Sequence, residues 1–236
     1  MSVLSRRRFL EVSAGAPLAV HPFVRSGGAA GFAEAAQRPK ALERHGCLLV
    51  DAGEHCALPE SLAGFRRGLE AASIPFQEVK LGEIPPACFL LVPAAALSAP
   101  GLAPALQRSC RLGSTVLLES GLAYLEPVLV ASDMELARCA FGLTVGAPVE
   151  LWPARSGHRR PPYVRYRWPL NAMVRDFSRV IPVFGAGDGL ARLADLTVAC
   201  RRPVGRGTLI FLGSPLGPHL GCGDPEALTL LKALLS

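Results

Sequence analysis

The chain has 236 residues, of which 50% are hydrophobic, 6% aromatic and 19% charged, and its formal net charge is +6. Beyond residue 35 no apolar run reaches the roughly 20 residues of a membrane-spanning helix, which excludes a transmembrane segment there. About 200 residues remain after that point, enough for one domain with a substantial core.

The N-terminus carries consecutive arginines followed by two apolar residues. Arg6, Arg7, Phe9 and Leu10 precede a short apolar region that prolines interrupt, and this order resembles a twin-arginine export signal. Ala33-Glu34-Ala35 supplies a small-x-small cleavage site. We therefore expect a signal peptide over residues 1–35, a linker over 36–45 and one domain over 46–236. The predicted partner is the twin-arginine translocation machinery, and the predicted location is the periplasm or another extracytoplasmic compartment.

Seven cysteines are spread along the chain, at positions 47, 56, 88, 110, 139, 200 and 222. No two lie within four residues of each other, so the local spacing of zinc and iron–sulfur sites is absent. We expect no metal and no other cofactor. An odd number leaves at least one cysteine unpaired within the chain, and we expect between zero and two disulfides.

The first half alternates short apolar runs with helical patterns. Strands are predicted over 46–51, 76–81, 88–92 and 114–118, and helices over 59–73 and 101–112 with a C-cap at Gly113. A further helix is expected after Gly121. This alternation predicts an α/β fold with a mainly parallel sheet and helices on both faces.

The second half changes in composition. Six prolines over residues 147–184 disfavour long helices, and we expect a proline-rich and arginine-rich insertion at about 153–180. Two apolar runs, 196–201 and 208–212, flank a glycine-containing turn and predict a β-hairpin. Residues 225–235 are expected to form the last helix.

Three segments together resemble the class I glutamine amidotransferase-like superfamily, whose fold is related to that of flavodoxin. They are the opening strand ending at Asp51, the segment Thr115–Gly121, and the ending that runs from Gly205 through Leu216 to Glu226. The resemblance implies a nucleophile on a sharp strand-to-helix turn, here at Ser120. Leu118 and Leu122 replace the flanking glycines of the family motif, and its His-Pro-Glu is missing. The resemblance thus implies a catalytically degenerate domain without glutamine hydrolysis.

Ser120 has two interpretations. It could be an activated serine, with His219 as base and Asp224 or Glu226 as orienting acid, which would make the protein a serine hydrolase. Alternatively, Ser120 ends a strand and caps the helix that follows it. The cap is the preferred interpretation.

A second candidate cluster follows the first strand. Asp51, Glu54 and His55 could line a pocket with Glu119 and Gly121, because ligands of open parallel sheets bind beside the carboxyl ends of the strands. The alternative is a solvated loop, and for metal binding that alternative is preferred.

Arginines dominate the segment 155–179, where seven of them accompany a single acid, Asp176. Arg159, Arg160, Arg165 and Arg167 are the candidate anion-binding residues. Tyr163, Tyr166 and Trp168 lie between them, a combination that also suits nucleic acid. Predicted export excludes nucleic acid as the expected partner, which leaves an envelope ligand or an acidic protein. The alternative to a binding site is an extended, solvated strand pair in which Arg165 and Arg167 share one face.

We therefore expect an exported domain that binds a ligand or partner in the cell envelope, with the serine hydrolase as the alternative. The sequence leaves the enzyme question open.

Overall fold

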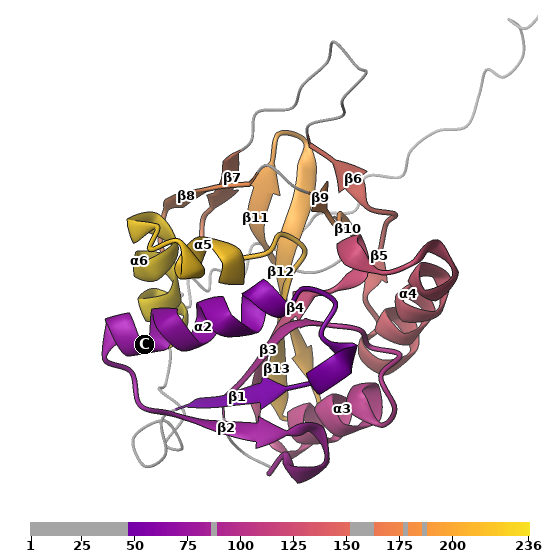
Figure 1. Ribbon diagram of the computed structural model, residues 1–236. Coiled ribbons are helices and arrows are strands. Elements are labelled where there is room, and N and C mark those ends of the chain that lie inside the picture. The colour runs from indigo at the N-terminus through magenta and orange to yellow at the C-terminus, as the bar shows by residue number, and fades with distance from the viewer. Residues whose placement is uncertain (1–46, 86–88, 152–162, 177–178, 186–187) are drawn as a thin grey trace, which may run out of the picture. The chain divides into compact units, whose positions relative to one another are not determined.

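The computed structural model describes residues 47–85, 89–151, 163–176, 179–185 and 188–236. Within them, nine strands form one mixed sheet in the order β2-β1-β3-β4-β13-β12-β11-β7-β8 (Figure 1). The first five strands run parallel: β2 Phe76–Lys80, β1 Cys47–Asp51, β3 Phe89–Ala95, β4 Thr115–Ser120 and β13 Gly207–Leu212. The other four run antiparallel to their neighbours: β12 Leu196–Val204, β11 Asp188–Leu193, β7 Tyr163–Tyr166 and β8 Ala172–Arg175.

Five α-helices, three short 3-10 helices and two small strand pairs complete the described structure. The α-helices are α2 Pro59–Ala72, α3 Leu102–Leu112, α4 Pro127–Phe141, α5 Gly217–Gly221 and α6 Pro225–Leu234. The small pairs are β5 Thr144–Val145 with β10 Val183–Phe184, and β6 Val149–Glu150 with β9 Arg179–Val180. No helix among the described residues is long and apolar enough to cross a membrane. The signal peptide and linker predicted over residues 1–45 lie outside the described residues.

The predicted mainly parallel sheet is wrong, because four of the nine strands run antiparallel. Connections of only five residues join β7 to β8, and two residues join β11 to β12 and β12 to β13. Such short connections can reverse the chain but cannot return it parallel, since a parallel crossover needs a dozen residues or more. The sequence predicted the last of these hairpins and, only as an alternative to an anion-binding segment, a strand pair around Arg165 and Arg167. Residues 163–166 and 172–175, expected within an insertion, form two strands of the main sheet.

Burial differs between the two parts of the sheet. Every residue of β3 is buried, as are the first four of β1, because helices cover both faces there. The strands β7 and β8 instead alternate buried and exposed residues, so only one of their faces is covered. This alternation places the polar side chains of β7 and β8 together on an open face.

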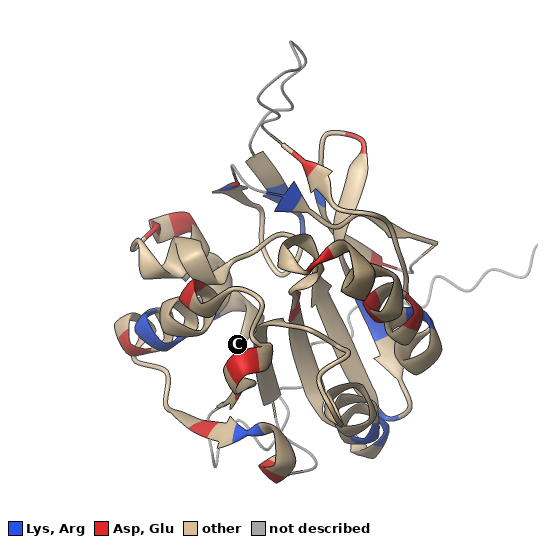
Figure 2. Ribbon diagram, turned by 45° about the vertical axis from the view of Figure 1, so that its right-hand side comes forward, with Lys and Arg blue, Asp and Glu red and all other residues tan. Residues whose placement is uncertain are grey.

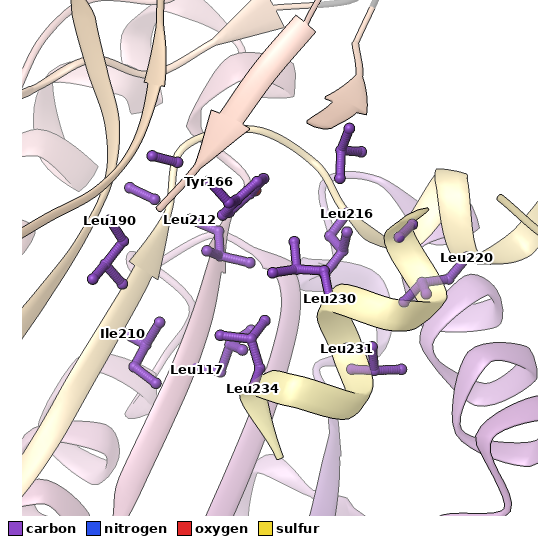
Figure 3. Close-up of a cluster of buried hydrophobic side chains, with 14 of the residues drawn as sticks. Leu117, Tyr166, Leu190, Ile210, Leu212, Leu216, Leu220, Leu230, Leu231 and Leu234 are labelled. Atoms are coloured by element: carbon purple, nitrogen blue, oxygen red, sulfur yellow. The ribbon is translucent and has the colours of Figure 1, made fainter. Parts of the chain in front are cut away.

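Two apolar layers enclose the sheet. On one face α2, α5 and α6 pack through Phe65, Leu220 and Leu230 against sheet residues that include Leu117 and Leu212. Figure 3 shows this layer, with leucines of α6 lying beside Tyr166 of β7. On the other face α3 and α4 pack against Leu118 and Phe211 through side chains such as Leu106 and Phe141. Each buried leucine contributes about 2 kcal/mol to folding, so these layers are the main stabilising term.

Helices α2 and α5 approach each other at backbone distance. A Cβ atom built on Gly64 of α2 would overlap the carbonyl oxygen of Gly217, and one built on Gly217 would overlap Ser61. Glycine is therefore required at both positions. The close approach also brings Ser61 of α2 next to the end of β4.

Candidate functional site

A buried carboxyl group lies at the end of β4. Glu119 is fully buried, and the hydroxyl of Ser61 donates a hydrogen bond of 2.6 Å to its Oε2. Burial raises the pKa of Glu119 to about 7, although Ser61 and the backbone N–H groups of Gly217 and Leu216 act in the opposite direction. Its Oε1 has no hydrogen-bond partner among the described residues. Glu119 is thus ready to hold a proton near neutral pH.

A second buried acid faces this group from the other half of the sheet. Asp176 follows β8 and accepts a 2.6 Å hydrogen bond from the hydroxyl of Ser214, which follows β13. The charge of Asp176 contributes to the raised pKa of Glu119. Burial together with both carboxylates also raises the pKa of the Tyr166 hydroxyl. Sequence reasoning found Glu119 but missed Ser61 and Ser214 and gave Asp176 no role, because no spacing rule connects residues so far apart.

Ser120 ends β4 with only 6% of its surface exposed, and its hydroxyl accepts a 3.3 Å hydrogen bond from the backbone N–H of Leu122. Gly121 is closely packed, since a Cβ atom there would lie 2.6 Å from the carbonyl oxygen of Ala94. His219 lies in α5, and no hydrogen bond joins it to Ser120 among the described residues. The N-cap of the 3-10 helix Leu122–Tyr124 is Gly121 and not Ser120, and this helix has no side-chain cap hydrogen bond. The cap and the hydrolase both stay predictions.

Asp224, a candidate orienting acid, is the N-cap of α6. Its Oδ1 accepts hydrogen bonds from the backbone N–H groups of Glu226 at 2.9 Å and Ala227 at 3.4 Å. We expect Asp224→Ala to lower the free energy of unfolding by about 1 kcal/mol, measured by urea denaturation, because two helix donors lose their acceptor. Asp224→Asn keeps a capping oxygen and is the matched control. Equal stability of the alanine and asparagine variants would contradict the capping role.

The loop after β1 holds the other predicted residues. The Asp51 side chain accepts a 2.8 Å hydrogen bond from the N–H of Gly53, and Glu54 and His55 lie on a short 3-10 helix at the surface. The loop approaches Glu119, since the charges of Glu119 and Asp51 contribute, after burial, to the raised pKa of the Cys56 thiol. No group of three or more potential metal ligands occurs among the described residues. All six described cysteines are free, and Cys88 lies outside that set.

The open face of β11, β7 and β8 carries the arginines that the sequence singled out. The register pairs Arg165 of β7 with Arg192 of β11 on one side and with Met173 of β8 on the other, so these three side chains form a row. Figure 2 shows Lys and Arg positions in blue on strands at the top of the view. Val164 and Tyr166 alternate with the arginines and belong to the buried layer beneath α6.

Two hollows adjoin Arg165 and Arg167. The larger cleft has a volume of about 550 Å³, within the range of small-molecule sites, and is lined by Arg165, Tyr166, Arg167, Asn171, Ala172, Met173 and Glu226. A second hollow of about 300 Å³ is lined by Tyr163, Arg165, Arg167, Arg192 and Ala194. Arg165 and Arg167 thus line both hollows, which adjoin each other at these two residues.

The guanidinium groups of Arg165 and Arg167 form no ion pair or side-chain hydrogen bond within the described part of the chain. Neighbouring arginines differ: Arg175 lies over the Tyr163 ring at 5.5 Å, and Arg201 pairs with Asp188 and lies over Trp168. Two positive charges therefore line the hollows without an ion-pair partner among the described residues. The candidates Arg159 and Arg160 lie outside the described residues. Sequence reasoning missed Asn171, Met173 and Arg192, which only strand pairing brings to this face.

Comparison with known proteins returned no matching family model and no matching curated protein. Among solved structures, a β-galactosidase from Bacillus circulans sp. alkalophilus is 16% identical, with a TM-score of 0.54 over 81% of this chain and 30% of that enzyme. An exo-β-1,4-mannosidase from Opitutaceae bacterium strain TAV5 is 12% identical, with a TM-score of 0.58 over 80% of this chain and 36% of that enzyme. The chain spans about a third of these glycosidases.

A smaller protein matches over nearly its whole length. The cytoplasmic protein STM1381 from Salmonella typhimurium LT2 is 12% identical, with a TM-score of 0.53 over 80% of this chain and 97% of that protein. These likenesses concern the fold alone. They overturn the predicted membership of the glutamine amidotransferase-like superfamily, because the similar structures are glycosidases and cytoplasmic proteins and the sheet is mixed. The glycine-flanked strands that suggested the superfamily are local features, which unrelated sheets share.

Proposed function

We propose that this protein is a binding domain that holds an anionic ligand in the two hollows lined by Arg165 and Arg167, beside β7, β8 and β11. The observation that carries the proposal is the pair Arg165 and Arg167, two guanidinium groups without a carboxylate partner in the described structure, facing a cleft of about 550 Å³. Guanidinium groups pair with carboxylates and phosphates through two parallel hydrogen bonds, which gives both affinity and orientation.

The position of the two arginines favours binding over a purely solvated surface. Arg165 lies on β7, whose Val164 and Tyr166 are buried in the layer that includes α6, and Arg167 directly follows this strand. The backbone at both arginines is therefore anchored by a packed strand. Arg192 adds a third positive charge in the adjoining hollow. Rigid support lowers the entropy lost when a ligand binds. The export predicted from the N-terminus would place such a ligand outside the cytoplasm.

The similar solved structures supply a weaker argument about the ligand. The β-galactosidase and the exo-β-1,4-mannosidase act on saccharides, as their names state, and this chain corresponds to only part of each. A saccharide is therefore a reasonable class of ligand to test.

Binding of inorganic tripolyphosphate, a compact polyanion, tests the proposal by isothermal titration calorimetry. We expect Arg165→Gln and Arg167→Gln each to weaken binding about tenfold, since one charge-assisted hydrogen-bonded pair contributes about 1.5 kcal/mol. Binding should also weaken as salt is raised, because these charges are exposed.

Arg108→Gln is the matched control, because Arg108 is an exposed arginine of α3 that lines neither hollow. Equal losses from Arg108→Gln and Arg165→Gln would mean that net charge alone, and not this cleft, holds the anion. No binding by the wild-type protein would exclude the proposal.

A further inference from the structure

The cleft that Arg165 and Arg167 share is not uniformly basic. Glu226, in the first turn of α6, lines the same 550 Å³ space, and so does Asn171 at the turn between β7 and β8. Although acid and arginines line one cleft, no ion pair joins Glu226 to either arginine among the described residues. The acid and the arginines therefore line one cleft without contacting each other.

A carboxylate beside an anion site lowers affinity for a simple anion by like-charge repulsion. The repulsion is offset only if the ligand presents a hydrogen-bond donor to the carboxylate. Asn171 both donates and accepts hydrogen bonds, so it also suits a ligand with hydroxyl groups. The lining thus matches a molecule that carries an acid at one end and donors at the other.

The adjoining hollow adds an aromatic surface. Tyr163, a residue 36% exposed, lines the 300 Å³ hollow together with Arg165, Arg167 and Arg192. Aromatic rings pack against apolar surfaces while their surroundings stay wet, which suits the C–H face of a sugar ring. Because both hollows contain Arg165 and Arg167, a ligand long enough to fill both would pass across these arginines.

We infer that the ligand is an acidic saccharide of two or more units, whose carboxylate groups meet Arg165 and Arg167 and whose hydroxyl groups meet Glu226 and Asn171. This inference rests on the proposed function and narrows it to one ligand class. It assigns Glu226 a role in specificity: the side chain selects hydroxylated anions over anions of equal charge that lack hydroxyls.

Three probes test the inference on the full chain by calorimetry: trigalacturonate, the acidic peptide triglutamate, and inorganic tripolyphosphate. We expect trigalacturonate to bind at least tenfold more tightly than triglutamate. Glu226→Ala is expected to weaken trigalacturonate binding at least fivefold while leaving tripolyphosphate binding unchanged or tighter. Loss of a negative charge alone would strengthen binding of both anions, so weaker binding of trigalacturonate without weaker binding of tripolyphosphate is the signature of hydroxyl recognition.

Asn171→Ala provides a second variant away from α6, expected to weaken trigalacturonate severalfold and leave tripolyphosphate binding unchanged. Thermal unfolding of both variants confirms that they are folded. Equal affinity for triglutamate and trigalacturonate, or tighter binding of both anions to Glu226→Ala, would overturn the saccharide inference while the anion site stands. Failure of all three probes to bind the wild-type protein would overturn the proposed function itself.

Discussion

Between pH 4 and pH 8 we expect the wild-type protein to lose about 3 kcal/mol of unfolding free energy that the Glu119→Gln variant keeps. Glu119 has its pKa raised from 4.5 to about 7 by burial at the end of β4. Each unit of difference between the folded and the unfolded pKa corresponds to about 1.4 kcal/mol of folding free energy.

The sign follows from where the proton is held. Between pH 4.5 and 7 the folded protein keeps a proton on Glu119 that the unfolded chain releases, so wild-type stability falls as pH rises through this window and is constant above it. Glutamine has no proton to lose, so the variant lacks this fall. Urea denaturation at intervals from pH 4 to pH 8 measures the difference.

Glu78→Gln is the control of opposite sign. Glu78 is exposed, and its two oxygens accept hydrogen bonds from Arg66 at 2.6 and 2.8 Å, which lowers the pKa of Glu78. The pair of Glu78 with Arg66 therefore adds to the free energy of unfolding at neutral pH, and this stabilisation is lost as pH falls. A Glu119→Gln variant whose stability has the same pH dependence as the wild type would show that folding does not raise the pKa of Glu119.

Gly64→Ala is expected to lower the free energy of unfolding by about 2 kcal/mol or more. Alanine is favoured over glycine inside a helix by about 1 kcal/mol, so helix propensity alone predicts stabilisation. The new methyl group would however overlap the carbonyl oxygen of Gly217, a backbone atom that no side-chain rotation can move away. Overpacking of this kind costs about 3 kcal/mol, which exceeds the gain. Thermal or urea unfolding measures the net change in the free energy of unfolding that results from these two effects.

Gly82→Ala is the matched control, because a Cβ atom at Gly82 would have nothing within 4 Å. Its stability is expected to remain within about 0.5 kcal/mol of the wild type. If Gly64→Ala were as stable as the control, α2 and α5 would have to be able to separate at little cost. The same separation would move Ser61 away from Glu119, so the pH dependence of Gly64→Ala is a second measurement of the contact.

Much of the candidate site lay within reach of the sequence. The apolar run before Glu119 placed that residue at a strand end, and the alternation around Arg165 placed it on the exposed face that β7 gives it. Arg167, predicted on the same face, directly follows β7 and is also exposed. The sequence did not predict the hydrogen-bond partners of the buried acids. Ser61 reaches Glu119 across 58 positions, and Ser214 reaches Asp176 across 38, distances at which no local pattern carries information.

The sequence by itself determined where most helices and strands of the first half and of the C-terminal end begin and end. Apolar periodicity, Gly113 as a C-cap and the turn before Gly207 are signals that act within a few residues. Only the tertiary structure decided that half of the sheet is antiparallel, that two acids are buried near each other, and that Glu226 shares a cleft with Arg165 and Arg167. Strand direction and charge burial depend on contacts between distant segments. These contacts form, and stabilise the protein, only when the layers pack together.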